Sequence, residues 1–109
     1  YLVAQIEEPG VVPHIDAIAA IPGVDVLFVG PGDLTIALGK FGQYDDPEVM
    51  AILRAVAAAC QRHGKLAGIP CAPEQVATYR KMGYGFFNVF SDYRGVFHGA
   101  KQALAAIQA

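Results

Sequence analysis

Short apolar runs alternate with amphipathic segments along the whole chain, and this alternation limits the folds that the chain can adopt. The apolar runs are Leu2–Ile6, Val24–Val29, Leu66–Pro70 and Phe86–Phe90. They do not alternate apolar with polar residues, which is typical of parallel strands covered on both faces. Strands that alternate with helices favour βαβ units with right-handed crossovers.

A helical pattern follows each of these runs. The clearest one begins at Pro47, where Asp46 is a good N-cap and proline suits the first helical position, and it ends before Gly64. The helices predicted in this way cover residues 13–21, 33–38, 47–63, 73–82 and 93–107. The last of them is expected to bury an apolar side against the core, made of Val96, Phe97, Ala100, Leu104 and Ile107.

This order of elements leaves two architectures, a doubly wound open sheet and part of an eight-stranded α/β barrel. Four βα units fit half of a barrel, whose full length is about 250 residues. The chain has 109 residues, and it opens with Tyr1 leading into a strand rather than with Met. We therefore expect residues 1–109 to form a single partial domain of a longer protein.

Composition and charge argue against several function classes. The net charge is −2 and no basic stripe is visible, so the electrostatic pattern of a nucleic-acid-binding protein is missing. The sequence has no polybasic segment that would suit a membrane surface and no apolar run of about 18 residues that could span a membrane. The first residues lack the positive region of a signal peptide. Cys60 and Cys71 do not form a CxxC pair and lack a histidine at zinc spacing. These features predict a cytoplasmic protein with both cysteines reduced.

Carboxylates collect where the first two predicted strands end. Gln5, Glu7 and Glu8 follow the first strand, and Gly30-Pro31-Gly32-Asp33 follows the second. Ligands bind at the carboxyl ends of the strands in both architectures. Two carboxylates from adjacent strands suit a hard cation such as Mg²⁺ or Mn²⁺, which can polarise a carbonyl group.

The glycines beside Asp33 add a second function to this edge. Without Cβ atoms they let backbone N–H groups approach an anionic ligand, and a helix N-terminus follows at once. A metal next to an anion-binding turn is what a 2-oxo acid requires, because its carboxylate needs N–H donors and its keto oxygen needs the cation. The residues therefore favour a metal-assisted site for such an acid.

Simpler interpretations of the same residues stay open at this point. Asp33 could only cap the following helix, Glu7 could be a solvated charge at a strand end, and residues 30–32 could be a plain turn without a full phosphate-binding pattern. Other reactive side chains carry weaker signals. Ser91 does not lie in a GxSxG elbow, and nothing near Cys71 in sequence would lower the pKa of its thiol. The three histidines, His14, His63 and His98, are interpreted as structural.

Two segments together resemble the HpcH/HpaI aldolase family, whose members are metal-dependent pyruvate aldolases on a (β/α)8 barrel. They are Gln5-Ile6-Glu7 and Phe28-Val29-Gly30-Pro31-Gly32-Asp33-Leu34, with Asp33 26 positions after Glu7. Further agreement is found at residues 16–18, 21–25, 38–39, 47–49, 64–65 and 67–68. The resemblance covers essentially the whole chain and implies the C-terminal half of a TIM-type barrel.

The resemblance implies a role for each matching position. Glu7 and Asp33 match the metal ligands for Mg²⁺ or Mn²⁺, with Co²⁺ a further candidate. Gln5 matches a glutamine of the substrate site, and the backbone N–H groups of Gly32 and Asp33 match those that receive the pyruvate carboxylate. Pro70 stands where the family usually has an apolar residue of the pocket wall.

The implied reaction is reversible cleavage of a 4-hydroxy-2-oxo acid to pyruvate and an aldehyde. Examples of the substrate are 4-hydroxy-2-oxoheptanedioate and 2-dehydro-3-deoxyglucarate. The partners are thus a small 2-oxo acid and an aldehyde, and the family implies a homo-oligomer, commonly a hexamer that exchanges its last helix between subunits. No lysine lies at a predicted strand end, in agreement with a mechanism without a Schiff base.

The chain also departs from the family pattern. Glu8-Pro9-Gly10 replaces the usual small or polar residue after the metal glutamate. The family's catalytic arginine and histidine lie in the other half of the barrel, so no catalytic residue is assigned here. Two alternatives remain: a CoA-thioester lyase of the citrate or malyl type on the same barrel, which residues 29–34 argue against, and an inactive half-barrel fragment that needs a partner chain.

Overall fold

The computed structural model describes residues 1–108, and within them four strands alternate with helices. The strands are β1 (Val3–Ile6), β2 (Val26–Val29), β3 (Leu66–Pro70) and β4 (Tyr84–Asn88). The α-helices are α1 (Ile15–Ala19), α2 (Pro31–Ala37), α3 (Pro47–His63), α4 (Val76–Met82) and α5 (Asp92–Gln108). Two 3₁₀ segments, η1 (Pro9–His14) and η2 (Pro73–Gln75), precede α1 and α4.

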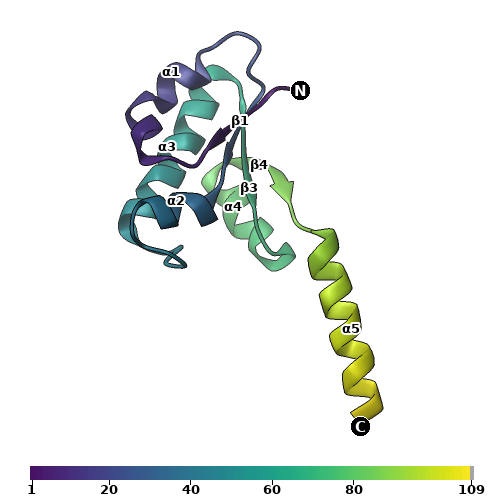
Figure 1. Cartoon of the computed structure of the whole chain (residues 1–109). Helices are drawn as coiled ribbons and strands as arrows, with labels where there is room; N and C mark the ends of the chain where they lie inside the picture. Colours follow the sequence, from purple (N-terminus) through teal and green to yellow (C-terminus); the bar gives the residue numbers. More distant parts are fainter. Residues whose placement is uncertain (109) are drawn as a thin grey trace.

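The four strands form one parallel sheet in the order β1-β2-β3-β4 (Figure 1). Each strand therefore pairs with the next one along the chain, and all four carboxyl ends lie at the same edge. Neighbouring strands that are parallel and joined by helices form the repeating unit of a (β/α) barrel. The predicted fold class is confirmed, because the sheet is that of a partial barrel.

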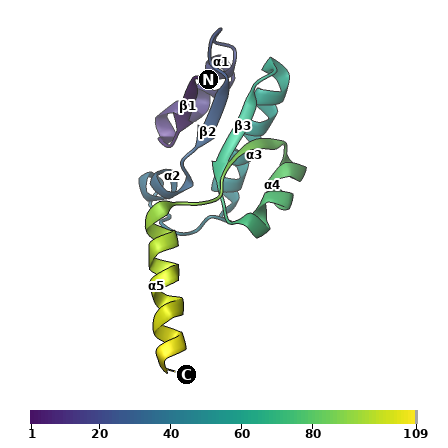
Figure 2. The same cartoon turned by 90° about the vertical axis from the view of Figure 1, so that its right-hand side faces the viewer.

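Helices α1 and α3 cover one face of the sheet and enclose the core with it (Figures 1 and 2). Helix α3 has the capping that the sequence predicts: Asp46 Oδ1 accepts a hydrogen bond from Glu48 N at 2.9 Å, and Gly64 closes the helix in the left-handed conformation at φ 64°. Its apolar stripe packs on the strands. The core includes the fully buried side chains Ile6, Leu27, Val29, Leu34, Leu53, Val56 and Ile69.

Strand β4 contains an irregularity that changes the direction of its side chains. Ala67 pairs with Tyr84 and Gly68 pairs with Phe86, so one extra residue stands in β4 opposite the step from Ala67 to Gly68. Tyr84 points toward the helices, where its hydroxyl donates to the Leu53 carbonyl at 3.0 Å. Phe86 lies on the other face, and its ring meets Phe28 edge-on at 6.0 Å.

The predicted element boundaries agree with the structure in most places. The predicted segments 47–63 and 66–70 match α3 and β3. The last predicted strand is displaced, because β4 begins at Tyr84, a residue only 3% exposed, and ends at Asn88. The predicted helices over 13–21 and 73–82 each begin as a 3₁₀ turn, η1 or η2, before the α-helix.

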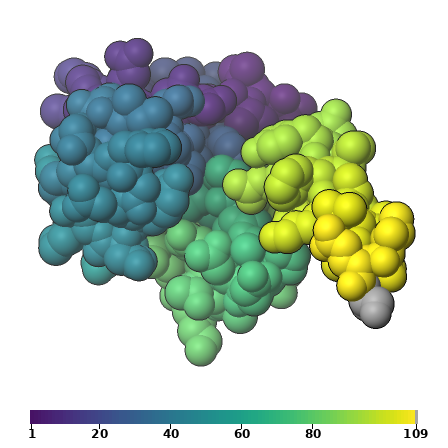
Figure 3. Space-filling view, turned by 60° about the horizontal axis from the view of Figure 1, so that its bottom comes forward, coloured from purple at the N-terminus to yellow at the C-terminus, as the bar shows by residue number. Residues whose placement is uncertain are grey.

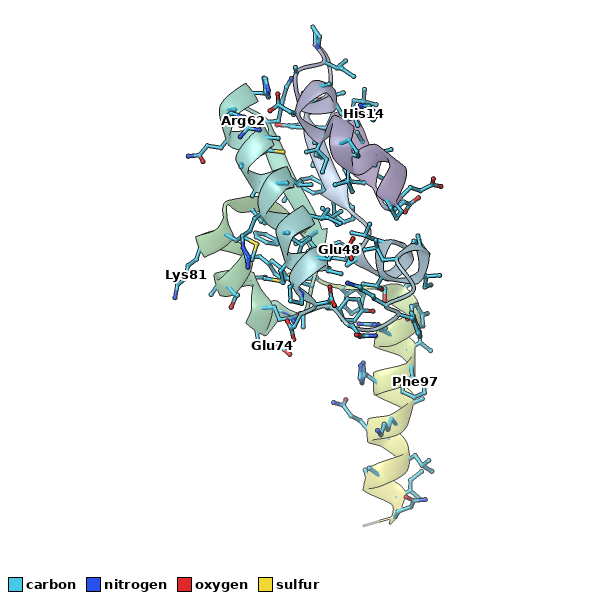
Figure 4. All side chains as sticks on the ribbon, turned by 90° about the vertical axis from the view of Figure 1, so that its left-hand side faces the viewer. His14, Glu48, Arg62, Glu74, Lys81 and Phe97 are labelled. Carbon is cyan, nitrogen blue, oxygen red and sulfur yellow. The ribbon has the colours of Figure 1, made fainter. Side chains whose placement is uncertain are left out.

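The prediction that the last helix buries its apolar side against the core was wrong. Helix α5 extends away from the rest of the molecule, as Figures 1 and 2 show, and forms a separate projection in the space-filling view of Figure 3. None of its described residues is buried: Val96 is 74% exposed and Ile107 82% exposed. Phe97 stands on the projecting helix in Figure 4. The amphipathic pattern was recognised correctly, but its partner is not this sheet.

An ion pair fastens α1 to the C-terminal end of α3, the end at which Figure 4 marks Arg62. Arg62 Nε donates to Asp16 Oδ1 at 2.9 Å, and His63 Nε2 lies 3.2 Å from the same oxygen. The Arg62 guanidinium, followed by His63, lowers the pKa of the Asp16 carboxyl below its ordinary value of 3.8. Ionised Asp16 therefore favours the folded state.

The first test concerns the buried tyrosine. Tyr84→Phe should lower the free energy of unfolding by about 1 kcal/mol, because it removes a buried hydrogen bond without changing shape much. Tyr79→Phe is the matched control, since the Tyr79 ring packs on Tyr84 at 5.7 Å and no hydrogen bond of its hydroxyl is found within residues 1–108. Urea unfolding measures both variants. Equal losses would contradict the role of the Tyr84 hydroxyl.

The second test concerns pH. The Asp16 contribution is present above the ordinary pKa of 3.8 and is lost as pH falls through the lowered folded-state value. Asp16→Asn should therefore have a lower Tm than the wild type at neutral pH, and the difference should shrink below about pH 4. Thermal unfolding at several pH values measures it. Adding Arg62→Gln to Asp16→Asn should cost little more, because both substitutions break the same pair.

Candidate active site

The site begins where β1 ends. Gln5 belongs to β1, and Glu7 is the first residue after it. Gln5 Nε2 donates to Glu7 Oε2 at 2.6 Å. Glu7 is partly buried, and its carboxylate is thus held in place by a neighbour from its own strand.

The backbone of Gly30 passes directly beside this pair. The Gly30 N–H donates to the Ile6 carbonyl at 3.0 Å, which continues the parallel pairing of Ile6 with Val29 one residue further. A Cβ atom on Gly30 would lie 3.0 Å from Gln5 Nε2, 3.0 Å from Glu7 Oε2 and 3.2 Å from Glu7 Cβ. The two side chains therefore occupy space that exists because residue 30 is glycine.

Helix α2 begins immediately after β2 and places Asp33 in its first turn. Asp33 is exposed, and its neighbour Thr35 is buried with its Oγ1 donating to the Gly32 carbonyl at 2.9 Å. The first N–H groups of a helix have no partner within the helix. Gly30, the N-cap, has no side chain that could bind them, so the N–H groups of Gly32 and Asp33 are suited to a bound anion.

Four of the five predicted site residues lie where β1 and β2 end. Gln5 and Glu7 are in contact, and Gly32 and Asp33 follow β2 in the adjacent turn. Within residues 1–108 no group of three or more His, Cys, Asp or Glu side chains could hold a metal ion. The described residues therefore offer at most two carboxylate ligands, and a cation there needs further oxygen ligands from water, substrate or other residues.

Pro70, the fifth predicted residue, ends β3 at the same edge and lines a groove of about 880 Å³. The groove runs between the end of β3, the start of α4 and the first turns of α5. Its wall includes Pro31, Tyr44, Cys71, Tyr79, Asn88 and Arg94. Sequence reasoning missed this groove, because its outer wall depends on where α5 leaves the sheet. Gln5, Glu7, Gly32 and Asp33 do not line it.

An ion-pair cluster fixes the loop that brings Tyr44 to the groove. Lys40 Nζ lies 2.6 Å from Asp46 Oδ1 and 2.8 Å from Glu48 Oε2, and Figure 4 marks Glu48 at the start of α3. The Asp46 and Glu48 carboxylates raise the pKa of Lys40, and Lys40 lowers the pKa of Asp46. The residue that caps α3 thus also fastens the loop before it.

The two cysteines are free thiols, as the sequence predicts. Burial raises the pKa of both Cys60 and Cys71. A raised pKa disfavours the thiolate, the reactive form of cysteine. The structure therefore gives no support to Cys71 as a nucleophile.

Comparison with known proteins identifies the family of this chain. A family model described as HpcH/HpaI aldolase/citrate lyase matches residues 1–99. The chain belongs to this family. It is 43% identical over 105 residues to the "5-keto-4-deoxy-D-glucarate aldolase" of Klebsiella pneumoniae, which covers 95% of this chain and 41% of that protein.

Two further members extend the comparison. The "2-dehydro-3,6-dideoxy-6-sulfogluconate aldolase" of Pseudomonas putida is 36% identical and covers 97% of this chain and 42% of its own length. A crystal structure of a family member from Burkholderia cenocepacia superposes with a TM-score of 0.89 at 34% identity, covering 98% of this chain and 42% of that one. The chain thus spans about two-fifths of the length of these relatives.

Among the helices of residues 1–108, none is long and apolar enough to cross a membrane.

The groove yields a chemical test. A maleimide should label Cys71 in the native chain, because it lines the groove, and leave Cys60 unmodified, because it is 1% exposed. One thiol per chain should react in buffer and two in denaturant. Mass spectrometry after digestion identifies the labelled residue. Labelling of Cys60 at the same rate as Cys71 in the native chain would contradict the arrangement.

Proposed function

We propose that Glu7 and Asp33 are the two protein ligands of a divalent cation, Mg²⁺ or Mn²⁺, with Co²⁺ a further candidate. The observation that carries the proposal is the placement of Glu7, held by Gln5 against the Gly30 backbone, one strand away from Asp33. Carboxylate oxygens are the ligands that such hard cations prefer. The space beside Gly30 fits an oriented carboxylate, which is what a metal ligand requires.

The same edge of the sheet suits a 2-oxo acid. When bound, the cation would supply positive charge that polarises the keto group and stabilises negative charge developing on its oxygen. The backbone N–H groups of Gly32 and Asp33 would bind the substrate carboxylate at the start of α2. Gln5 lies beside Glu7 and would line the same space. Pro70, which ends β3 at the same edge, would form part of the pocket wall on the side of the groove.

The reaction that this arrangement supports best is aldol cleavage of a 4-hydroxy-2-oxo acid to pyruvate and an aldehyde. The relatives named as aldolases of deoxy sugar acids support a substrate such as 2-dehydro-3-deoxyglucarate, with 4-hydroxy-2-oxoheptanedioate as another member of the class. Carbon–carbon bond cleavage of this type makes the protein a lyase. We place this chain in the C-terminal half of the barrel. Proton transfer is assigned to none of its residues.

We also propose that the protein is a homo-oligomer in which α5 packs on another subunit. The apolar side of α5 has no partner among the described residues, and Val96 and Phe97 are exposed by 74% and 63%. Large exposed apolar patches mark interaction sites. A hexamer would follow the family pattern.

Metal and inhibitor binding test the proposed site. Titration of the chain with Mn²⁺, followed by electron paramagnetic resonance, should show one site. Glu7→Gln and Asp33→Asn should each weaken it at least tenfold, because each removes a charged ligand. Glu8→Gln is the matched control, since Glu8 is the exposed neighbour of Glu7.

Oxalate extends the test to the substrate class, because it resembles the enolate of pyruvate. Oxalate should bind in the presence of Mn²⁺ and not after EDTA treatment. In the complete enzyme, release of pyruvate from a 4-hydroxy-2-oxo acid should likewise stop on metal removal. Pyruvate release that survived both EDTA and Glu7→Gln would refute the metal assignment.

A further inference from the structure

We infer that Gly30 is a positioning residue for the metal ligand Glu7, and that it acts together with the Gln5 amide. Gly30 itself would touch neither cation nor substrate with a side chain. The inference rests on the proposed function, because it concerns how one of the proposed ligands is oriented. It explains why residue 30 is glycine, and it assigns the Gln5 amide a positioning role toward the carboxylate.

The backbone conformation does not explain the glycine. Gly30 has φ −95° and ψ 83°, values that lie on the ordinary negative-φ side and are open to residues with a Cβ atom. By contrast, Gly64 and Gly83 close α3 and α4 with positive φ, where glycine is favoured. The reason for glycine at position 30 must therefore be space.

The space is taken by the two side chains of the site. A Cβ atom on residue 30 would be 3.0 Å from both Glu7 Oε2 and Gln5 Nε2. These atoms are the ends of flexible side chains, so an added methyl group would push them aside rather than prevent folding. Glu7 Cβ at 3.2 Å is closer to the backbone and limits where the carboxylate could move. Alanine at position 30 is thus expected to displace the carboxylate.

The hydrogen bond from Gln5 defines the orientation that would be lost. Gln5 Nε2 donates to Glu7 Oε2 at 2.6 Å, a short contact to a charged acceptor. It occupies one carboxylate oxygen and leaves Oε1 for the cation, which favours a ligand that binds through one oxygen. Residues that hydrogen-bond to a metal ligand commonly change metal affinity by about 10–100-fold when they are replaced.

Two variants and one control test this role without measuring turnover. Gly30→Ala removes the space and Gln5→Leu removes the donor, and each should weaken Mn²⁺ binding about tenfold in a calorimetric titration. Gly10→Ala is the control, because Gly10 follows Glu7 closely in sequence and a Cβ there would meet no atom within 4 Å. The Tm of Gly30→Ala should stay near that of the wild type.

A second readout needs no metal. In the metal-free chain, nuclear magnetic resonance should show different chemical shifts for the two Gln5 side-chain amide protons, because the amide donates to Glu7. Glu7→Gln or Gly30→Ala should move these chemical shifts toward the values of a free amide. An unchanged Gln5 signal or unchanged Mn²⁺ affinity in Gly30→Ala would overturn the positioning role while leaving the proposed metal site intact. A wild-type chain that bound no Mn²⁺ at all would instead refute the metal site. In that case the change of the Gln5 signal in Gly30→Ala would alone show whether Gly30 and Gln5 orient the Glu7 carboxylate.

Discussion

The parallel pairing of β1 with β2 is the constraint on which the candidate site depends. The hydrogen bond from the Gly30 N–H to the Ile6 carbonyl extends the ladder one residue beyond Val29, the last paired residue of β2. It brings the backbone of residue 30 against Glu7 and starts α2 at a fixed point after β2. If this pairing slipped by one residue, the side chains of one strand would turn to the other face. The Gln5 and Glu7 side chains would then no longer lie beside the Gly30 backbone.

Helix α3 maintains this pairing from a distance. Its buried stripe packs on the strands, its first turn is tied to Lys40 through Asp46, and its last turn is tied to α1 through Arg62 and Asp16. The hydrogen bond from Tyr84 to Leu53 joins β4 to the same helix. Helix α3 is therefore attached both to α1, which follows β1, and to β4. Burial of its apolar side chains already determines its position, and the surface ion pairs refine that position.

Most of the strands and helices could be predicted from the sequence, because the capping residues and the pattern of apolar residues indicate the same elements. The apolar runs identified all four strands, and Asp46 with Gly64 located both ends of α3. Glu7 and Asp33 could be placed at neighbouring strand ends for the same reason. The contact between Gly30 and Glu7 could not be foreseen, since it depends on register. The position of α5 could not be foreseen either, because an amphipathic helix indicates that it needs an apolar partner and not which one it meets.

The extra residue in β4 allows one short strand to serve two layers of the molecule. In a regular strand residues 84 and 86 would face the same way. The shift between Ala67 and Gly68 instead sends Tyr84 to the helices and Phe86 to the opposite face, where Gly68 leaves room for the rings of Phe28 and Phe86. The strand thus joins the helical layer and the inner face of the sheet within three residues. Changes in chain length at Gly85 would separate these two attachments, whereas changes of side chain at Gly85 would leave both in place.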